Sequence, residues 1–90
     1  MKVLVTGGTV FVSKYVAWYY VNKGYEVYVL NRNSRPQVEG VHLLEADRHN
    51  CREVLKGHYF DAVFDVTAYT AEDIKDLLVG LEGFGHYVMI

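Results

Sequence analysis

The chain has 90 residues, of which 51% are hydrophobic and 22% charged, and its formal net charge is −2. This length and composition predict one small domain around one core, and they exclude two domains or a disordered chain. The charge offers no basic surface for nucleic acid or anionic lipid, and no apolar run is long enough to span a bilayer. No signal peptide is visible, and the single cysteine, Cys51, fits a reducing compartment. We therefore expect one cytoplasmic domain over residues 1–90 that binds neither nucleic acid nor membrane.

The first half of the chain predicts two strands with a helix between them. Lys2–Thr6 is a β-branched run without alternation, which is typical of a strand covered on both faces. Val10–Lys23 has the pattern of a helix, and Gly24 stands at its C-terminal cap. Glu26–Asn31 is a second apolar strand, and a polar loop follows it.

The middle of the chain continues the alternation of strands and helices. Val41–Glu45 predicts a third strand, Asn50–Leu55 a short helix, and Phe60–Thr67 a fourth, mostly apolar strand. The thiol of Cys51, within this range, is expected to be half-buried.

A second long helix and a last strand complete the chain. Thr70–Leu81 begins with Thr70 as an N-cap, and Asp73 three residues later predicts a box-like cap. Gly83 and Gly85 are expected to break the chain before a strand at His86–Ile90. Strands that alternate with helices form a parallel sheet through right-handed crossovers. The sequence therefore predicts a three-layer, Rossmann-like α/β fold of about five strands in the order 3-2-1-4-5.

A glycine-rich turn stands between the first strand and the first helix. Gly7 and Gly8 follow Thr6 directly, and the helix begins shortly afterwards. Glycines let the backbone approach a phosphate, and a helix N-terminus presents free N–H groups and a partial positive charge. A tight strand-to-helix turn needs glycines for its dihedral angles in any case. A pyrophosphate site and a purely structural turn both remain open on this evidence.

Several short motifs occur together in one order along the whole chain. They are Thr6-Gly7-Gly8-Thr9, Phe11, Gly24-Tyr25-Glu26-Val27, Asn31-Arg32, Asp47 and Asp61-Ala62-Val63-Phe64-Asp65-Val66. With these motifs the chain resembles the N-terminal part of the extended short-chain dehydrogenases/reductases, the NAD-dependent epimerase/dehydratase family. It is most similar to members that begin TGGTxFxG. Family members are much longer, so the resemblance implies a truncated member.

The resemblance implies a role for each matching position. Gly7, Gly8, Phe11 and Val12 would face the pyrophosphate of a dinucleotide. Asn31 and Arg32 would lie beside the adenosine ribose, Asp47 beside the adenine, and Thr67 would line the cofactor past the fourth strand. An acidic residue after the second strand favours the 2′-hydroxyl of NAD, and because Asn31 and Arg32 stand there, NADP is at least as plausible.

Two positions depart from the glycine pattern of the family. Val10 and Ser13 stand where the pattern TGxxGxxG has glycine. The glycine at position 13 allows close packing of helix on strand, so a side chain there is expected to push the helix outward or to occupy phosphate space. We expect no bound cofactor, or an NAD(P) site weakened by Ser13.

No catalytic residue is predicted in this chain. The family uses a serine or threonine just beyond the strand that ends here at Ile90, and a Tyr-x-x-x-Lys pair further on. Tyr19 and Lys23 satisfy that spacing but lie in the first helix, far from the strand edge where the pair acts. The histidines have no metal-ligand spacing with Cys51, so no metal site is expected either.

The first helix has an unusual aromatic face. Its buried stripe is expected to comprise Val12, Val16, Ala17, Tyr20 and Val21. The opposite face would then present Tyr15, Trp18, Tyr19 and Asn22 at helical spacing. Large aromatic side chains gathered on a surface are typical of an interface, so this face predicts a protein partner or a homodimer, either natural or engineered on a reductase scaffold. Exposure of these side chains without a function stays open as the alternative.

Two functions of different class are thus expected. The first is a non-catalytic protein-binding module that uses the aromatic face. The alternative is the NAD(P)-binding N-terminal fragment of an epimerase/dehydratase-type oxidoreductase.

Overall fold

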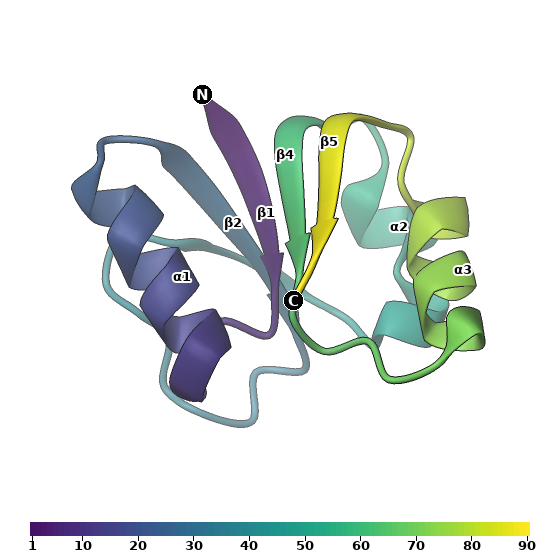
Figure 1. Ribbon diagram of the computed structural model, residues 1–90, viewed down its shortest axis with the longest axis horizontal. Helices are drawn as coiled ribbons and strands as arrows, with labels where there is room; N and C mark the ends of the chain where they lie inside the picture. Colours follow the sequence, from purple (N-terminus) through teal and green to yellow (C-terminus); the bar gives the residue numbers. More distant parts are fainter.

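Five parallel strands form one sheet in the order β3-β2-β1-β4-β5, as the sequence predicts. The computed structural model describes residues 1–90. The strands are β1 (Lys2–Thr6), β2 (Glu26–Asn31), β3 (His42–Glu45), β4 (Tyr59–Asp65) and β5 (Gly83–Met89). Figure 1 shows the sheet between two helical layers, with α1 on one side and α2 and α3 on the other. The predicted three-layer α/β fold is confirmed.

The helices lie within a residue or two of their predicted positions, with one exception. The long ones are α1 (Phe11–Asn22) and α3 (Ala71–Gly80). The predicted capping box of α3 is present, because the Thr70 side chain accepts from the Asp73 backbone N–H and the Asp73 carboxylate accepts from that of Thr70. The predicted helix Asn50–Leu55 is wrong in extent. Its place is taken by a 3-10 turn, η1 (Arg48–Asn50), and a single helical turn, α2 (Arg52–Leu55).

Each face of the sheet has its own core. On the α1 side the buried residues are Val3, Val5, Ala17, Val27 and Val29. On the α2 and α3 side they are Leu4, Leu30, Cys51, Leu55, Phe60, Val63, Leu77 and Leu81. Successive residues of β1 therefore point to opposite cores, which explains why its centre, Val3, Leu4 and Val5, is apolar without alternation.

The buried stripe of α1 differs from the prediction at one position. Val12 is 51% exposed, whereas Ser13 and Ala17 are the two buried residues of the helix. These two positions are four residues apart and therefore share one face. The small side chains at this face let α1 lie close to the strands, so the prediction that Val12 is buried is wrong.

The last strand is longer than predicted, because Gly83 and Gly85 belong to it. A Cβ atom at Gly85 would lie 2.6 Å from the backbone oxygen of Asp61, and one at Gly83 would lie 2.8 Å from the ring of Tyr59. These glycines thus permit close contact between β5 and β4. The expected break of the chain at Gly83 and Gly85 is wrong, because both are part of the strand.

The thiol of Cys51 is buried on the α2 side of the sheet. Cys51 is only 2% exposed, so the half-buried thiol expected from the sequence is wrong. Its sulfur lies next to Gly80, where a Cβ would approach it to 2.7 Å, and burial raises the pKa of the thiol.

None of the helices has the length and apolar character that crossing a bilayer requires.

Candidate functional site

A cavity of about 310 Å³ opens at the carboxyl ends of the strands. Its lining residues are Gly7, Leu30, Asn31, Arg32, Ser34, Ala46, Asp47, Arg48, His49 and Thr67. These residues stand at the ends of β1, β2, β3 and β4 or in the segments that directly follow them. In open α/β sheets this edge is where ligands bind.

The glycine turn after β1 has a conformation that requires glycine at both positions. Gly7 and Gly8 have φ values of +84° and +90°. A Cβ at Gly8 would lie 2.6 Å from the Val29 side chain, and a Cβ at Gly7 would lie 3.1 Å from both Ser13 and Thr67. The turn therefore has room for backbone only, and it brings the Gly7 peptide to the wall of the cavity.

Ser13 lies on the inner side of α1, next to the glycine turn. Its side chain is buried beside Gly7, and its hydroxyl donates to the Val10 carbonyl at 2.8 Å. Ser13 is absent from the cavity lining. The expectation that it occupies phosphate space is therefore not met, and its effect on dinucleotide affinity stays a prediction.

The N-terminus of α1 leaves its first amides without a side-chain cap. Val10 at the N-cap position is extended and makes no capping hydrogen bond, and the first turn contains no acidic residue. Phe11 has a φ of +46°, in the left-handed region, and is 88% exposed. An uncapped helix start next to a glycine turn favours an anion over a neutral group.

Asn31 uses its side chain to hold the loop after β2. Its Nδ2 donates to the Gly7 carbonyl at 2.6 Å and to Gln37 Oε1 at 3.1 Å. Its Oδ1 accepts from the Asn33 backbone N–H at 2.8 Å and from Gln37 Nε2 at 3.1 Å. The loop is thereby fixed against the glycine turn, and Asn31 has a structural task at the position where the resemblance implies a ribose contact.

Arg32 is the cavity residue whose positive charge remains available to a ligand. Its side chain is 76% exposed, and its Nη1 lies 3.9 Å from the Asp47 carboxylate. An ion pair that long and that exposed contributes little, so a ligand anion can replace it. Asp47 itself is engaged in local structure, because its Oδ1 accepts from the His49 backbone N–H at 2.9 Å.

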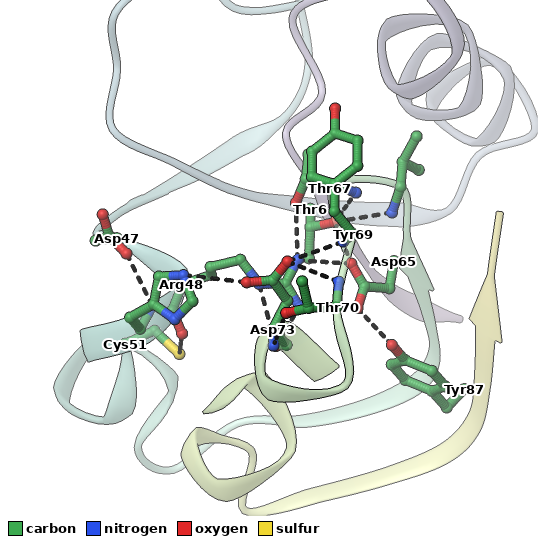
Figure 2. A network of polar contacts seen from close by, with 12 residues as sticks. Thr6, Asp47, Arg48, Cys51, Asp65, Thr67, Tyr69, Thr70, Asp73 and Tyr87 are labelled. Carbon is green, nitrogen blue, oxygen red and sulfur yellow. Dashed lines mark hydrogen bonds and ion pairs between the residues drawn. The ribbon is translucent and has the colours of Figure 1, made fainter. Parts of the chain in front are cut away.

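Arg48 forms the other wall of the cavity and is joined to a buried carboxylate (Figure 2). Its Nη1 and Nη2 donate to the two Asp65 oxygens at 2.8 and 2.9 Å. Further hydrogen bonds go to the Thr67 hydroxyl at 2.8 Å and to the Asp73 carbonyl at 2.6 and 3.2 Å. The pair ties η1, the end of β4 and the start of α3 together.

Asp65 is fully buried, and every neighbour that touches its carboxylate donates to it. Besides Arg48, the Thr6 hydroxyl donates at 3.0 Å and the Tyr87 hydroxyl donates from β5. Burial opposes the ionised form, but the hydrogen bonds from Arg48 and Tyr87 outweigh it and hold the pKa of Asp65 below its ordinary value. Burial and the contact with Asp65 raise the pKa of the Tyr87 hydroxyl well above its ordinary value.

His49 lines the cavity and links η1 to α3. Its Nδ1 lies 2.6 Å from Asp76 Oδ2, and its Nε2 lies 3.3 Å from Asp73 Oδ1. The hydrogen bond to Asp76 raises the pKa of His49 above the ordinary value.

The structure brings together five of the eight residues to which the resemblance gives a cofactor role. Gly7, Asn31, Arg32, Asp47 and Thr67 line the cavity. Gly8, Phe11 and Val12 do not line it, although they belong to the turn and helix start beside Gly7. The cavity residues that sequence reasoning missed are Leu30, Ser34, Ala46, Arg48 and His49.

The aromatic face of α1 is exposed. Tyr15 and Trp18 are 62% and 51% exposed, with ring centroids 6.0 Å apart, and Tyr19 stacks beside Tyr15 at 6.3 Å. Asn22 is also exposed, and its amide donates to the Trp18 carbonyl. None of these residues lines the cavity, so this face is separate from the site, and a protein partner or homodimer stays a prediction.

The fold holds neither a cluster of metal ligands nor a Tyr-x-x-x-Lys pair at the cavity. No group of three or more metal-ligating side chains gathers in the fold. Lys23 places its ammonium 5.3 Å from the centroid of the Tyr19 ring. Neither residue lines the cavity, so this Tyr-x-x-x-Lys pair lies apart from the site.

Known structures share this fold over most of the chain. A proposed NADH-flavin reductase from Streptococcus pneumoniae TIGR4 matches with a TM-score of 0.75 at 22% identity, covering 100% of this chain and 46% of its own. Vestitone reductase from alfalfa (Medicago sativa) matches with a TM-score of 0.69 at 21% identity, covering 98% of this chain and 35% of its own. The chain thus spans less than half the length of these structures.

A third similar structure is a short chain dehydrogenase family protein from Francisella tularensis, with a TM-score of 0.57 at 24% identity over 86% of this chain and 38% of its own. No curated protein is significantly similar in sequence. The family comparison is more specific, because residues 3–78 match the NAD dependent epimerase/dehydratase family and include the glycine turn and all the residues that line the cavity. The chain belongs to the NAD dependent epimerase/dehydratase family.

Proposed function

We propose that this chain is the dinucleotide-binding part of an epimerase/dehydratase-type oxidoreductase. The observation on which the proposal rests is the cavity at the strand ends, where the Gly7 turn, the loop held by Asn31 and the exposed Arg32 face the same space. The family match and the reductases among the similar structures support it.

The residues present fit a dinucleotide. The turn at Gly7 and Gly8 leaves no room for a Cβ, so a phosphate can reach the backbone there. The uncapped first turn of α1 follows directly and favours a negative group. The amides at the start of α1 would hold the pyrophosphate beside Gly7, whose own N–H donates to the Leu30 carbonyl at 2.8 Å. Arg32, Ser34 and Asp47 would surround the adenosine end.

We propose NADP as the preferred form. The end of β2 presents no carboxylate to a ribose 2′-hydroxyl, because Asn31 stands there and its amide is bound to Gly7 and Gln37. Arg32 next to it has its charge exposed and can bind a 2′-phosphate through charge-assisted hydrogen bonds.

A bound NADP would supply the hydride carrier, while the protein supplies binding and orientation. We propose that the 90 residues alone bind the dinucleotide without turning over a substrate. The only Tyr-x-x-x-Lys pair of the chain is Tyr19 with Lys23, and it lies on α1 outside the cavity.

The test is a titration of the purified chain with NADPH and NADH, followed by calorimetry. We expect binding of NADPH, weaker binding of NADH, and at least a tenfold loss of affinity in Gly7→Ala, whose new Cβ would meet Ser13 and Thr67. Gly57→Ala is the matched control, because Gly57 has a similar φ of +80° and no atom within 4 Å of the new Cβ. The proposal is wrong if the unaltered chain binds neither dinucleotide, or if Gly57→Ala loses as much affinity as Gly7→Ala.

A further inference from the structure

Arg48 lines the cavity but has no hydrogen-bond donor left for a ligand. A guanidinium has five N–H groups. Here two are taken by the Asp65 carboxylate, two by the Asp73 carbonyl and one by the Thr67 hydroxyl (Figure 2). The side chain is also only 11% exposed. Arg48 is therefore unsuited to bind a phosphate directly, in contrast to Arg32.

The contact with Arg48 decides how the Thr67 hydroxyl can act. Because the Thr67 oxygen accepts from Arg48 Nη1 at 2.8 Å, its own proton points elsewhere. No protein group accepts that proton, and Thr67 lines the cavity. A hydroxyl that accepts from a cation is also a stronger donor, since hydrogen bonds in a chain polarise one another.

The other branch of Thr67 fixes its side-chain rotamer. The Thr67 methyl group is one of the two atoms that a Cβ at Gly7 would meet at 3.1 Å, so it lies against the glycine turn. With the methyl at Gly7 and the oxygen at Arg48, the hydroxyl proton is free to be donated to a ligand in the cavity that Thr67 lines. The backbone is held as well, because the Thr6 hydroxyl accepts from the Thr67 and Val66 N–H groups.

We infer that Arg48 and Asp65 are positioning residues, which hold the Thr67 hydroxyl as a hydrogen-bond donor to an acceptor oxygen of the ligand in this cavity. This inference rests on the proposed dinucleotide-binding function and adds to it the residues that position Thr67, which the resemblance already places beside the cofactor. Both Asp65 oxygens accept hydrogen bonds from the Arg48 guanidinium and fix its position. The hydroxyls of Thr6 and Tyr87 donate to the same carboxylate and fix Asp65 in turn.

The first experiment compares two variants of Thr67 in NADPH titrations. Thr67→Val keeps the shape and the methyl contact with Gly7 but loses the hydroxyl, and we expect about a tenfold loss of affinity. Thr67→Ser keeps the hydroxyl, and we expect its affinity to stay within threefold of the unaltered chain. Equal affinities for the two variants would overturn the inference.

The second experiment tests whether Arg48 acts through Thr67. Arg48→Met alone leaves the Asp65 carboxylate buried without its cation, so Arg48→Met is combined with Asp65→Asn, which keeps acceptor and donor groups for Thr6 and Tyr87. We expect this double variant to fold and to bind NADPH several-fold more weakly. In that background Thr67→Val should cost less than threefold, because the hydroxyl is no longer directed. A full tenfold cost there would show that Arg48 and Asp65 are merely structural.

The failure of this inference can be told apart from the failure of the proposed function. If the unaltered chain binds no dinucleotide, the proposed function is wrong and the inference falls with it. If the chain binds NADPH and loses affinity in Gly7→Ala, but Thr67→Val and Thr67→Ser bind equally well, the proposed function stands and this inference alone is wrong.

Discussion

The guanidinium of Arg48 and the carboxylate of Asp65 form a bidentate ion pair, with N–O distances of 2.8 and 2.9 Å, although the two residues are 17 positions apart in the sequence. Asp65 is fully buried in this pair. Removing one partner of a buried pair leaves a charge without compensation, which commonly costs about 3–5 kcal/mol. We expect Arg48→Met to lower the free energy of unfolding by about that amount, measured by urea denaturation.

The control for this prediction is Arg52→Met, which removes an exposed arginine close by on α2. It should change the free energy of unfolding by less than about 0.5 kcal/mol, as is usual for surface substitutions. Combining Arg48→Met with Asp65→Asn should restore more than half of the lost stability, because no buried charge remains. A single Arg48→Met variant as stable as the unaltered chain would contradict the geometry of the pair.

The fold was predictable because its signals are local. The central strands β1, β2 and β4 are mostly apolar runs. The start of α3 is marked by Thr70 at the N-cap and by Asp73 three residues later. The alternation of strands and helices then leaves few topologies. The start of the last strand was predicted wrongly, because it depends on packing between distant segments. The closeness of Gly85 to the Asp61 backbone cannot be seen in the sequence of either strand.

The polar wall of the cavity was not predictable in the same way. Arg48 comes from the segment after β3, Asp65 from the end of β4 and Tyr87 from β5, so only the strand order brings them together. One signal was present, since Asp65 ends a mostly apolar strand, and a carboxylate buried there needs a partner. The sequence does not say which of its arginines that partner is.

Ser13 gives rise to two opposed expectations that one variant can separate. The glycine pattern of the family predicts that Ser13→Gly tightens NADPH binding. In the structure, however, the Ser13 hydroxyl turns back to the Val10 carbonyl and the residue does not line the cavity. We therefore expect affinity to change less than threefold in calorimetry, while the helix loses about 0.5–1 kcal/mol of stability from a glycine within α1. An affinity gain of tenfold would favour the family pattern over the geometry.

Arg32 should give the chain its higher affinity for NADPH than for NADH. Its exposed guanidinium is the free positive charge beside the loop after β2. We expect Arg32→Ala to weaken NADPH binding at least tenfold, since hydrogen bonds to charged groups contribute about 1.5–3 kcal/mol, and to change NADH binding less than threefold. Arg52→Ala is the control for a general change of net charge. Equal losses for NADPH and NADH would contradict a 2′-phosphate contact.

His49 should make stability depend on pH around neutrality. The hydrogen bond to Asp76 raises the pKa of His49 in the folded chain, and the carboxylates of Asp47 and Asp73 act in the same direction. A raised pKa means that the stabilising contribution is fully present below the unfolded value of about 6.5 and is lost as pH rises through the folded pKa. The melting temperature of His49→Gln should therefore fall below that of the unaltered chain more at pH 5.5 than at pH 8.5. Arg48 nearby remains charged throughout this range, so it does not alter the sign.

The control for the pH dependence is Asp76→Asn, which removes the carboxylate nearest to His49 Nδ1. The difference between the two pH values should shrink in this variant, because His49⁺ loses its main partner. A melting temperature difference that is larger at pH 8.5 than at pH 5.5 would contradict the assigned hydrogen bond.

Trp18 reports on the aromatic face of α1. Half of its side chain is exposed beside Tyr15, so in a dilute monomer its fluorescence should be quenched readily by acrylamide. Trp18→Ala should leave the melting temperature nearly unchanged, because the indole is not part of either core. If the predicted partner is a second copy of the chain, sedimentation of the unaltered protein will show dimers at high concentration, and Trp18→Ala will shift them to monomers. An indole shielded from acrylamide in the dilute monomer would contradict an exposed aromatic face, and with it the surface on which a partner is predicted.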